Sequence, residues 1–181
     1  MTSRLIVGFT GPVGCGKTTA ADALVKMLNF ERVRFAETLK AMSRAFGLSE
    51  AQVDGDQKEI PCDLLCGKTP RFFMQRLGTE FGRELIGDDV WIRAWRYYVE
   101  LVPLLRGIVV DDIRYANEAE AVRDAGGVVV RIIRPGGTRR DAHVSEKFEF
   151  MPDVTLPNDG TQADMVAKVV TLAGKMRARE K

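Results

Sequence analysis

One segment constrains this chain more than any other, and it reads Gly11-Pro12-Val13-Gly14-Cys15-Gly16-Lys17-Thr18. It fits the pattern G-x-x-x-x-G-K-[ST], follows the apolar, strand-length run of residues 4–10, and opens an amphipathic helical pattern. Glycines let consecutive backbone N–H groups point toward a phosphate, and the helix N-terminus adds a partial positive charge. We therefore expect residues 11–18 and Thr19 to bind nucleotide phosphates, with Lys17 at the β- and γ-phosphates and the Thr18 hydroxyl on Mg²⁺.

Apolar runs of strand length alternate with helical patterns along the 181 residues, which is about one domain. We expect strands at 4–10, 32–36, 107–110, 128–133 and near 153–156, and helices at 37–46, 70–86, 88–102, 116–125 and 161–179. This alternation predicts an α/β fold with a parallel sheet covered on both faces, the three-layer fold of P-loop NTPases. The expected division is a core of 1–36, 103–133 and 151–181, a helical acceptor-binding region of 37–102, and a short lid of 134–150.

Composition excludes several other classes of protein. The net charge of +2 lacks the strong basic excess of nucleic-acid-binding proteins, so no nucleic acid partner is expected. Three cysteines and the single histidine His143 argue against a disulfide framework and against a structural zinc site. No apolar stretch approaches the roughly 20 residues of a membrane span, so we expect a cytoplasmic protein with no membrane partner.

A P-loop alone does not define what receives the phosphate, because GTPase switches, motor ATPases and small-molecule kinases all use one. The strand at 107–110 ends in Asp111-Asp112, which puts carboxylates at the sheet edge where ligands of open α/β sheets bind. We expect Asp112 to hold Mg²⁺, while the other acid of the pair caps a turn.

The helix expected from Pro70 has two different faces when it is projected at 100° per residue. The predicted core face consists of Phe73, Met74, Leu77, Phe81 and Leu85. The opposite face carries Arg71, Gln75, Gly78, Thr79, Gly82 and Arg83. Two helical glycines on one face predict a notch for a flat group, with Arg71 meeting a phosphate and Gln75 a base edge. The alternative is a solvated face whose glycines serve close helix packing.

These residues resemble the phage deoxynucleoside monophosphate kinases, relatives of the nucleoside monophosphate kinases. The match runs in order along nearly the whole chain through the P-loop, Phe35–Lys40, Thr69–Arg83 with Trp91, Asp112–Glu120, His143–Glu146 and Asn158–Gly160. Two departures from the family pattern, Thr38 and Ala116, are local changes in turns.

The resemblance implies reversible, Mg²⁺-dependent transfer of phosphate from ATP to a deoxynucleoside monophosphate. Acceptor binding would fall to the residues Lys40, Arg71, Gln75, Gly78, Thr79, Arg83 and Trp91. Alternatives are another P-loop small-molecule kinase, such as dephospho-coenzyme A kinase, or a non-enzymatic nucleotide-binding switch. A homodimer and, for a phage-encoded protein, a location in the host cytoplasm complete these expectations.

Residues 131–140 contain four arginines and no acid, namely Arg131, Arg134, Arg139 and Arg140. Phosphoryl transfer between two anions needs guanidinium groups that neutralise the phosphates, so we expect Arg139 and Arg140, with Arg114, to supply that charge. The alternatives are a nucleic-acid patch or a solvated loop. His143 is expected to orient or cap rather than to act as a base.

Overall fold

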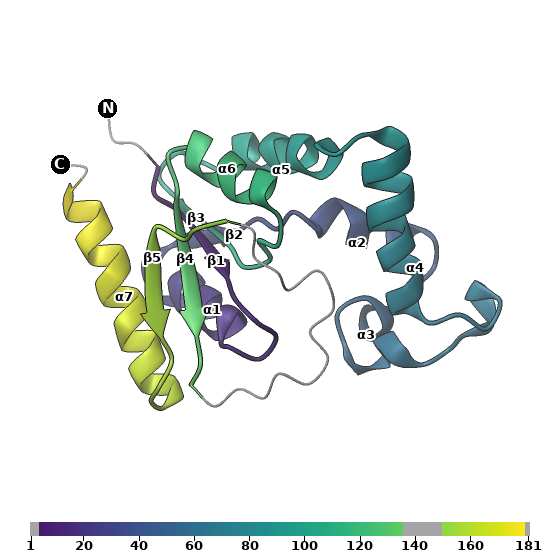
Figure 1. Ribbon diagram of the computed structural model, residues 1–181, viewed down its shortest axis with the longest axis horizontal. Helices are drawn as coiled ribbons and strands as arrows, with labels where there is room; N and C mark the ends of the chain where they lie inside the picture. The colour runs from purple at the N-terminus through teal and green to yellow at the C-terminus, as the bar shows by residue number, and fades with distance from the viewer. Residues whose placement is uncertain (1–3, 136–149, 180–181) are drawn as a thin grey trace. The chain divides into compact units, whose positions relative to one another are not determined.

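The computed structural model in Figure 1 describes residues 4–135 and 150–179. Its sheet is parallel and has the strand order β2-β3-β1-β4-β5. The strands are β1 (Ile6–Thr10), β2 (Phe30–Arg32), β3 (Gly107–Val110), β4 (Val128–Ile133) and β5 (Val154–Pro157). The central strand β1 pairs with both β3 and β4, so its carboxyl end, where the P-loop begins, is flanked by strand ends on either side.

Helices cover both faces of this sheet, as the sequence predicted. The helices α1 (Lys17–Leu28) and α7 (Gln162–Arg179) share one buried cluster with Val7 and Phe9 of β1. On the other face, Ile113 and Val122 of α6 (Ala116–Asp124) and the turn before it lie against Gly8. A Cβ on Gly8 would lie 2.4 Å from Ile113 Cδ1, so this position in β1 accommodates only glycine without rearrangement.

The chain forms two compact units, which we call the sheet unit (Met1–Arg34 with Tyr98–Lys181) and the helical unit (Phe35–Tyr97). Helical-unit elements are α2 (Glu37–Ala45), α3 (Glu50–Val53), the 3₁₀ turns η1 (Asp56–Glu59) and η2 (Asp63–Leu65), α4 (Pro70–Arg76), η3 (Leu77–Ile86) and α5 (Val90–Leu101), which continues into the sheet unit. A small core of Leu48, Val53 and Leu65 holds α3 and α4 together. Near the two ends of this unit, the rings of Phe35 and Trp95 lie 4.9 Å apart between centroids.

The second strand lies earlier than predicted, at Phe30–Arg32 instead of 32–36. Asn29 ends α1 in the left-handed conformation, so the strand begins at the next residue. Phe30 then packs over Gly107 of β3, where a Cβ would lie 2.7 Å from its ring. The alternation of Val33 and Phe35 suggested a longer strand, but Phe35 belongs to the helical unit and packs on Trp95.

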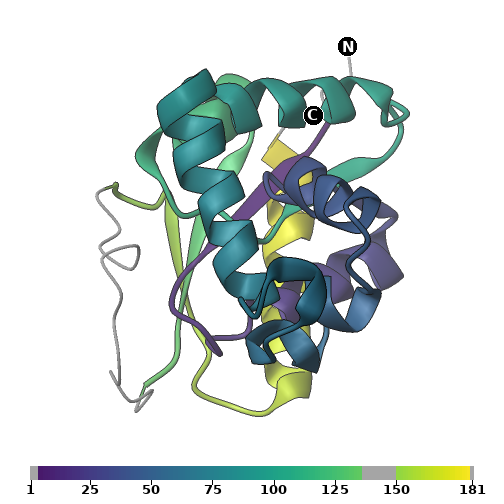
Figure 2. The ribbon, with the colours of Figure 1, turned by 90° about the vertical axis from the view of Figure 1, so that its right-hand side faces the viewer.

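The single helix expected over 70–86 changes its geometry at Leu77. After α4, the segment η3 is a π-helix, in which backbone bonds span five residues, and Figure 2 shows the two as one continuous helical ribbon. A projection at 100° per residue is therefore correct only for α4. Phe73 and Met74 pack against the helical core as predicted, whereas Phe81 and Leu85 are 42% and 72% exposed, contrary to the prediction.

Within residues 4–135 and 150–179, every helix is too short or too polar to cross a membrane.

Candidate active site

The P-loop connects β1 to α1 through a conformation that requires glycine. Gly11, Gly14 and Gly16 have φ angles of 139°, 75° and 108°, which side-chain-bearing residues rarely adopt. At Gly11 the space is closed as well, since a Cβ would lie 2.4 Å from the carbonyl oxygen of Ile132. The α-helix then begins at Lys17. The motif thus has the strand, loop and helix that phosphate binding at a helix N-terminus demands.

The Lys17 ammonium lies over the loop. Its Nζ donates to the carbonyl oxygens of Gly11 at 2.6 Å and Pro12 at 2.8 Å, and it is 3.8 Å from Cys15 Sγ. Burial raises the pKa of the Cys15 thiol, although the charge of Lys17 acts in the opposite direction. A neutral thiol does not compete for the lysine's charge, which is available to an anion in the loop.

The two acids that follow β3 differ in their surroundings. Asp111 is buried, and its Oδ1 accepts from Arg34 Nε at 2.8 Å while Arg32 Nε lies 3.7 Å from its Oδ2. A carboxylate held between two guanidinium groups is part of the framework at this sheet edge. Asp112, the half-buried next residue, stays the candidate for Mg²⁺.

A buried carboxylate missed by sequence reasoning shapes the turn that carries Arg114. Glu118, only 5% exposed, accepts from the backbone N–H groups of Arg114 at 2.8 Å and Tyr115 at 3.2 Å. Thr10 fixes the same turn from β1, because its hydroxyl donates to the carbonyl of Ile113 at 3.1 Å. The signal was present in the sequence, since a glutamate at the third position of a helix typically bonds back to the residues before the helix.

A second missed contact joins the loop before α7 to the P-loop. Asn158 Nδ2 donates to the carbonyl oxygen of Cys15 at 2.8 Å, across 143 positions of sequence. No local pattern predicts a contact between residues so far apart.

In the helical unit, the predicted acceptor-binding cations are held by oxygen atoms of the unit itself. Arg71 forms an ion pair with Glu59, and Lys40 Nζ lies 2.6 Å from Asp54 Oδ1. Arg83 Nη1 donates to the carbonyl of Asp88 at 3.1 Å. Arg71 is placed by a well-formed helix start, in which the Thr69 hydroxyl accepts from the N–H of Phe72 at 3.1 Å and Pro70 opens α4.

The glycine notch predicted on the Arg71 face is filled by the protein. A Cβ on Gly82 would lie 2.4–2.6 Å from three atoms of the Trp91 indole, and Trp91 Nε1 donates to the carbonyl of Gly78 at 2.8 Å. Trp91 is only 6% exposed. The flat group that approaches the glycines is therefore a tryptophan of the same unit, and the expectation of an open notch at Gly78 and Gly82 was wrong.

The other predicted site residues have simpler surroundings. The side chains of four of them are exposed, namely Thr18, Gln75, Thr79 and Arg114, whereas Thr19 is half-buried. Arg139, Arg140 and His143 lie outside the described residues.

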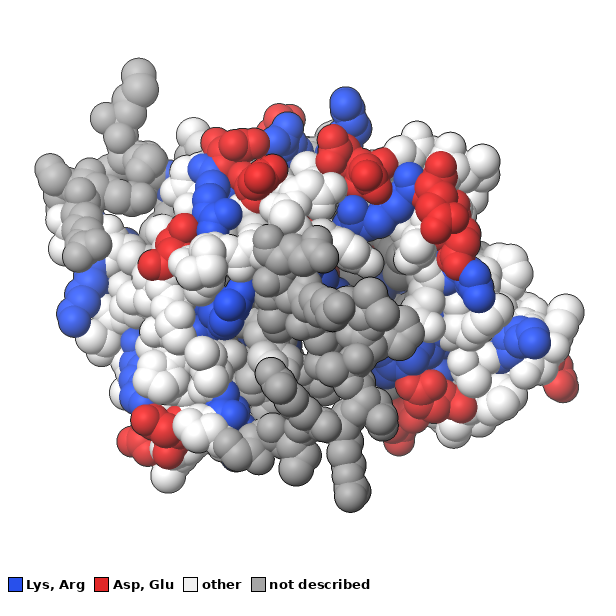
Figure 3. All heavy atoms as spheres, in the orientation of Figure 1, with Lys and Arg blue, Asp and Glu red and all other residues white. Residues whose placement is uncertain are grey.

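On the face of the molecule in Figure 3, lysine and arginine lie among aspartate and glutamate. Among the residues that the structure describes, three or more His, Cys, Asp or Glu side chains nowhere gather as a metal cluster.

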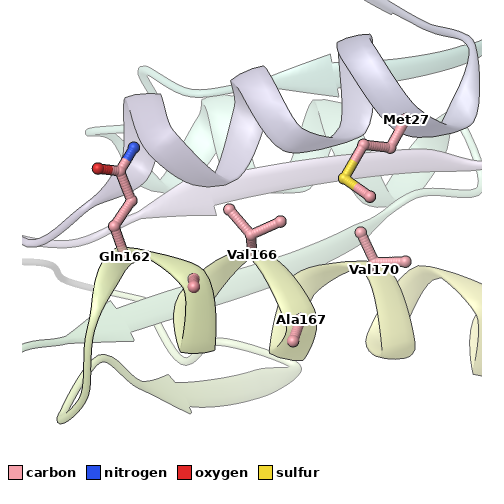
Figure 4. Close-up of a pocket in the computed structure, with 6 residues that line it drawn as sticks. Met27, Gln162, Val166, Ala167 and Val170 are labelled. Atoms are coloured by element: carbon pink, nitrogen blue, oxygen red, sulfur yellow. The ribbon is translucent and has the colours of Figure 1, made fainter.

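A shallow apolar depression of about 580 Å³ lies between α1 and α7 in the sheet unit (Figure 4). It is lined by Met27, Gln162, Ala163, Val166, Ala167 and Val170. Its lining includes no residue of the P-loop and no charged group.

The P-loop on the central strand of a parallel sheet, with an acid after the neighbouring strand, defines the P-loop NTPase fold. A solved relative of this fold is the APS kinase of Mycobacterium tuberculosis in complex with AMPPNP and APS. It is 16% identical, covers 96% of this chain and 99% of its own, and has a TM-score of 0.53.

The model of the deoxynucleotide monophosphate kinase family matches residues 68–169. A mimivirus protein (Acanthamoeba polyphaga mimivirus) assigned to that activity is 32% identical over 92% of this chain and 95% of its own length. The deoxynucleotide monophosphate kinase of Escherichia phage RB69 is 29% identical, but that match covers 55% of this chain and 42% of the phage protein. The chain belongs to the deoxynucleotide monophosphate kinase family.

Proposed function

We propose that the protein transfers the γ-phosphate of ATP to a deoxynucleoside monophosphate, yielding ADP and a deoxynucleoside diphosphate. The observation that carries this proposal is the extent of the family match. It covers residues 68–169, from just before Arg71 to beyond Arg114, and leaves out the P-loop at 11–18. The match therefore does not derive from the nucleotide-binding loop that many enzymes share. It includes residues 68–102 of the expected acceptor-binding region and continues through residues 103–169.

On the donor side, the backbone N–H groups of the P-loop bind the ATP phosphates. Lys17 exchanges the carbonyl oxygens of Gly11 and Pro12, which it contacts at 2.6 and 2.8 Å, for phosphate oxygens. A charged phosphate oxygen is a stronger partner for an ammonium group than a carbonyl, so the exchange favours the bound state. Thr18 and Asp112 have the oxygen donors that suit Mg²⁺, which when bound would neutralise charge on the donor phosphates.

On the acceptor side, Arg71 binds the monophosphate, and its exposed ion pair with Glu59 supports this role. Exposed ion pairs are worth about 0–1 kcal/mol, so a phosphate dianion can replace the carboxylate at little cost. Lys40, Gln75, Thr79 and Arg83 are proposed to contact the rest of the nucleotide. Gly78 and Trp91 support the π-helix that carries Thr79 and Arg83.

In the transfer step, an oxygen of the acceptor phosphate forms a bond to the γ-phosphorus as the bond to the β–γ bridging oxygen breaks. The bonding electrons leave with ADP. The attacking oxygen is already anionic, so the chain needs no general base and acts by positioning and by neutralising charge. From the sequence, Arg114, Arg139 and Arg140 are the cations proposed to stabilise the transferring group.

A coupled assay of ADP release tests this function. We expect turnover with one or more of the four deoxynucleoside monophosphates in the presence of Mg²⁺, and little ADP release without an acceptor. Ribonucleoside monophosphates and dephospho-coenzyme A serve as competing acceptors. Turnover with dephospho-coenzyme A alone, or ADP release that no acceptor stimulates, would contradict the proposal.

A further inference from the structure

Asn158 reaches the P-loop from the opposite end of the chain. It follows β5, and its side-chain amide donates from Nδ2 to the carbonyl oxygen of Cys15 at 2.8 Å. A carbonyl oxygen only accepts hydrogen bonds, so the side chain must present its NH₂ group to the loop. An asparagine thus contacts the backbone of the phosphate-binding loop without itself belonging to the motif.

This contact controls the orientation of one peptide group. In a trans peptide the C=O and the following N–H lie in one plane and point in opposite directions. The carbonyl of Cys15 shares its peptide with the N–H of Gly16. When Asn158 holds that carbonyl, the N–H of Gly16 is held pointing away from Asn158. This N–H belongs to the row of loop amides that a P-loop uses to bind phosphate.

Asn158 also lies directly over Gly16. A Cβ added to Gly16 would come within 2.7 Å of Asn158 Nδ2, and Gly16 has a φ of 108°. Glycine is therefore needed at position 16 for two reasons. It permits the positive φ of the backbone, and it leaves space for the side-chain amide of Asn158 to reach the loop.

The asparagine is itself well anchored. Its backbone N–H donates to the carbonyl of Ile133 at 2.7 Å, which extends the pairing of β4 with β5. The adjacent loop is tied to α7, because Lys168 Nζ donates to the carbonyl of Pro157 at 3.0 Å and pairs with Asp159. Because Asn158 is anchored to the sheet in this way, it can hold the Cys15–Gly16 peptide in one orientation before a nucleotide binds.

We propose that Asn158 is a positioning residue for the donor nucleotide, and that it presets the Cys15–Gly16 peptide so that the Gly16 N–H faces the phosphates. The inference rests on the proposed function only in that the P-loop takes the donor. The contact made by Asn158 is expected to affect binding of the donor nucleotide and to leave binding of the acceptor unchanged.

The test compares Asn158→Ala and Asn158→Asp with Thr155→Ala, a control that alters an exposed side chain of β5 but neither the contact with the P-loop nor the anchoring of Asn158. ADP affinity is measured by calorimetry, and the KM values for ATP and for the acceptor by the coupled assay. We expect ADP to bind about ten-fold more weakly to both Asn158 variants, the scale of one lost hydrogen bond to a group that orients a charged ligand. The acceptor KM and the control variant should stay within about two-fold of the parent protein.

The pH dependence of Asn158→Asp separates positioning from a general loss of structure. An ionised carboxylate cannot donate to the Cys15 carbonyl and repels phosphate, whereas a protonated carboxyl group donates as the amide does. The ADP affinity of this variant, divided by that of the parent protein, should therefore recover as the pH falls from 7 to 5, while that of Asn158→Ala should not. Equal loss of donor and acceptor binding, or ADP affinity within two-fold of the parent in Asn158→Ala, would overturn the proposal. Failure of the parent protein to phosphorylate any deoxynucleotide while it still binds ADP would overturn the proposed function instead.

Discussion

The two units of this protein hold their candidate phosphate-binding groups in different ways. In the sheet unit, the P-loop is shaped by backbone geometry, with three glycines at positive φ and a carbonyl held by Asn158. In the helical unit, the candidate cations Arg71 and Lys40 are side chains paired with carboxylates. A backbone cradle is formed before the ligand binds, whereas an ion-paired side chain must exchange one partner for another. We therefore expect the donor site to be rigid and general, and the acceptor site to be adaptable.

The largest effect is expected in the sheet unit, from Lys17→Ala. Loss of this ammonium, which lies over the loop, should lower kcat by at least about 100-fold, equivalent to about 2.7 kcal/mol, because the donor phosphates lose a cation that neutralises their charge. Lys26→Ala, which removes an exposed lysine from the last turn of the same helix α1, is the matched control and should keep its activity. Normal circular dichroism with parental turnover in Lys17→Ala would mean that the P-loop does not serve the donor.

The two acids after β3, in the sheet unit, are expected to affect different properties of the protein: Asp112 its activity and Asp111 its stability. Asp112→Asn should lower turnover by about ten-fold or more in a way that high Mg²⁺ partly restores, since an amide oxygen is a weaker ligand than a carboxylate. Asp111→Asn should instead reduce the free energy of unfolding by about 1.5–3 kcal/mol, because Arg34 loses a charged partner. Urea denaturation and Mg²⁺ titrations of activity would measure both. If Asp111→Asn lowered the Mg²⁺-dependent turnover and Asp112→Asn lowered the free energy of unfolding, Asp111 would be the residue that faces the metal.

In the helical unit, the contact of Trp91 with the π-helix should be sensitive to a single methyl group. Gly82→Ala places a Cβ within 2.4 Å of the indole and should cost about 1–3 kcal/mol of stability. Gly78→Ala meets only the end of the Leu39 side chain, at 3.0 Å, and should be much closer to neutral. Urea denaturation followed by tryptophan fluorescence compares the two. Equal stabilities would show that the close contact of Gly82 with Trp91 does not form in solution.

The smallest effect, and the one most specific to the acceptor, concerns Arg71 of the helical unit. Arg71→Ala should raise the KM for the monophosphate by about ten-fold, the lower end of what a charged hydrogen bond contributes, and leave the KM for ATP unchanged. Arg76→Ala, on the same helix and paired with Glu80, is the control. An equal rise in both KM values would assign Arg71 to the fold or to the donor site.

Sequence alone predicted the two regions unequally, for physical reasons. The P-loop and the parallel sheet were predictable because glycine spacing and apolar runs are local signals. The π-helix was not, because the apolar spacing around Phe81 and Leu85 also fits an α-helix. The contacts of Asn158 with Cys15 and of Trp91 with Gly82 depend on tertiary packing, to which spacing is insensitive. The buried ion pair of Asp111 with Arg34 joins the ends of two strands in the same way.

The contact between Phe35 and Trp95 has a consequence for how the chain folds. Strands β2 and β3 are neighbours, yet Phe30 pairs with Gly107 across the whole helical unit, and such a long intervening loop slows strand pairing. Phe35 and Trp95 meet near the two ends of that unit, with ring centroids 4.9 Å apart. Once the helical unit has formed, it therefore shortens the loop that β2 and β3 must close. We expect the amides of the edge strand β2 to become protected from hydrogen exchange after those of the helices in residues 35–97, so that folding of the helical unit precedes completion of the sheet.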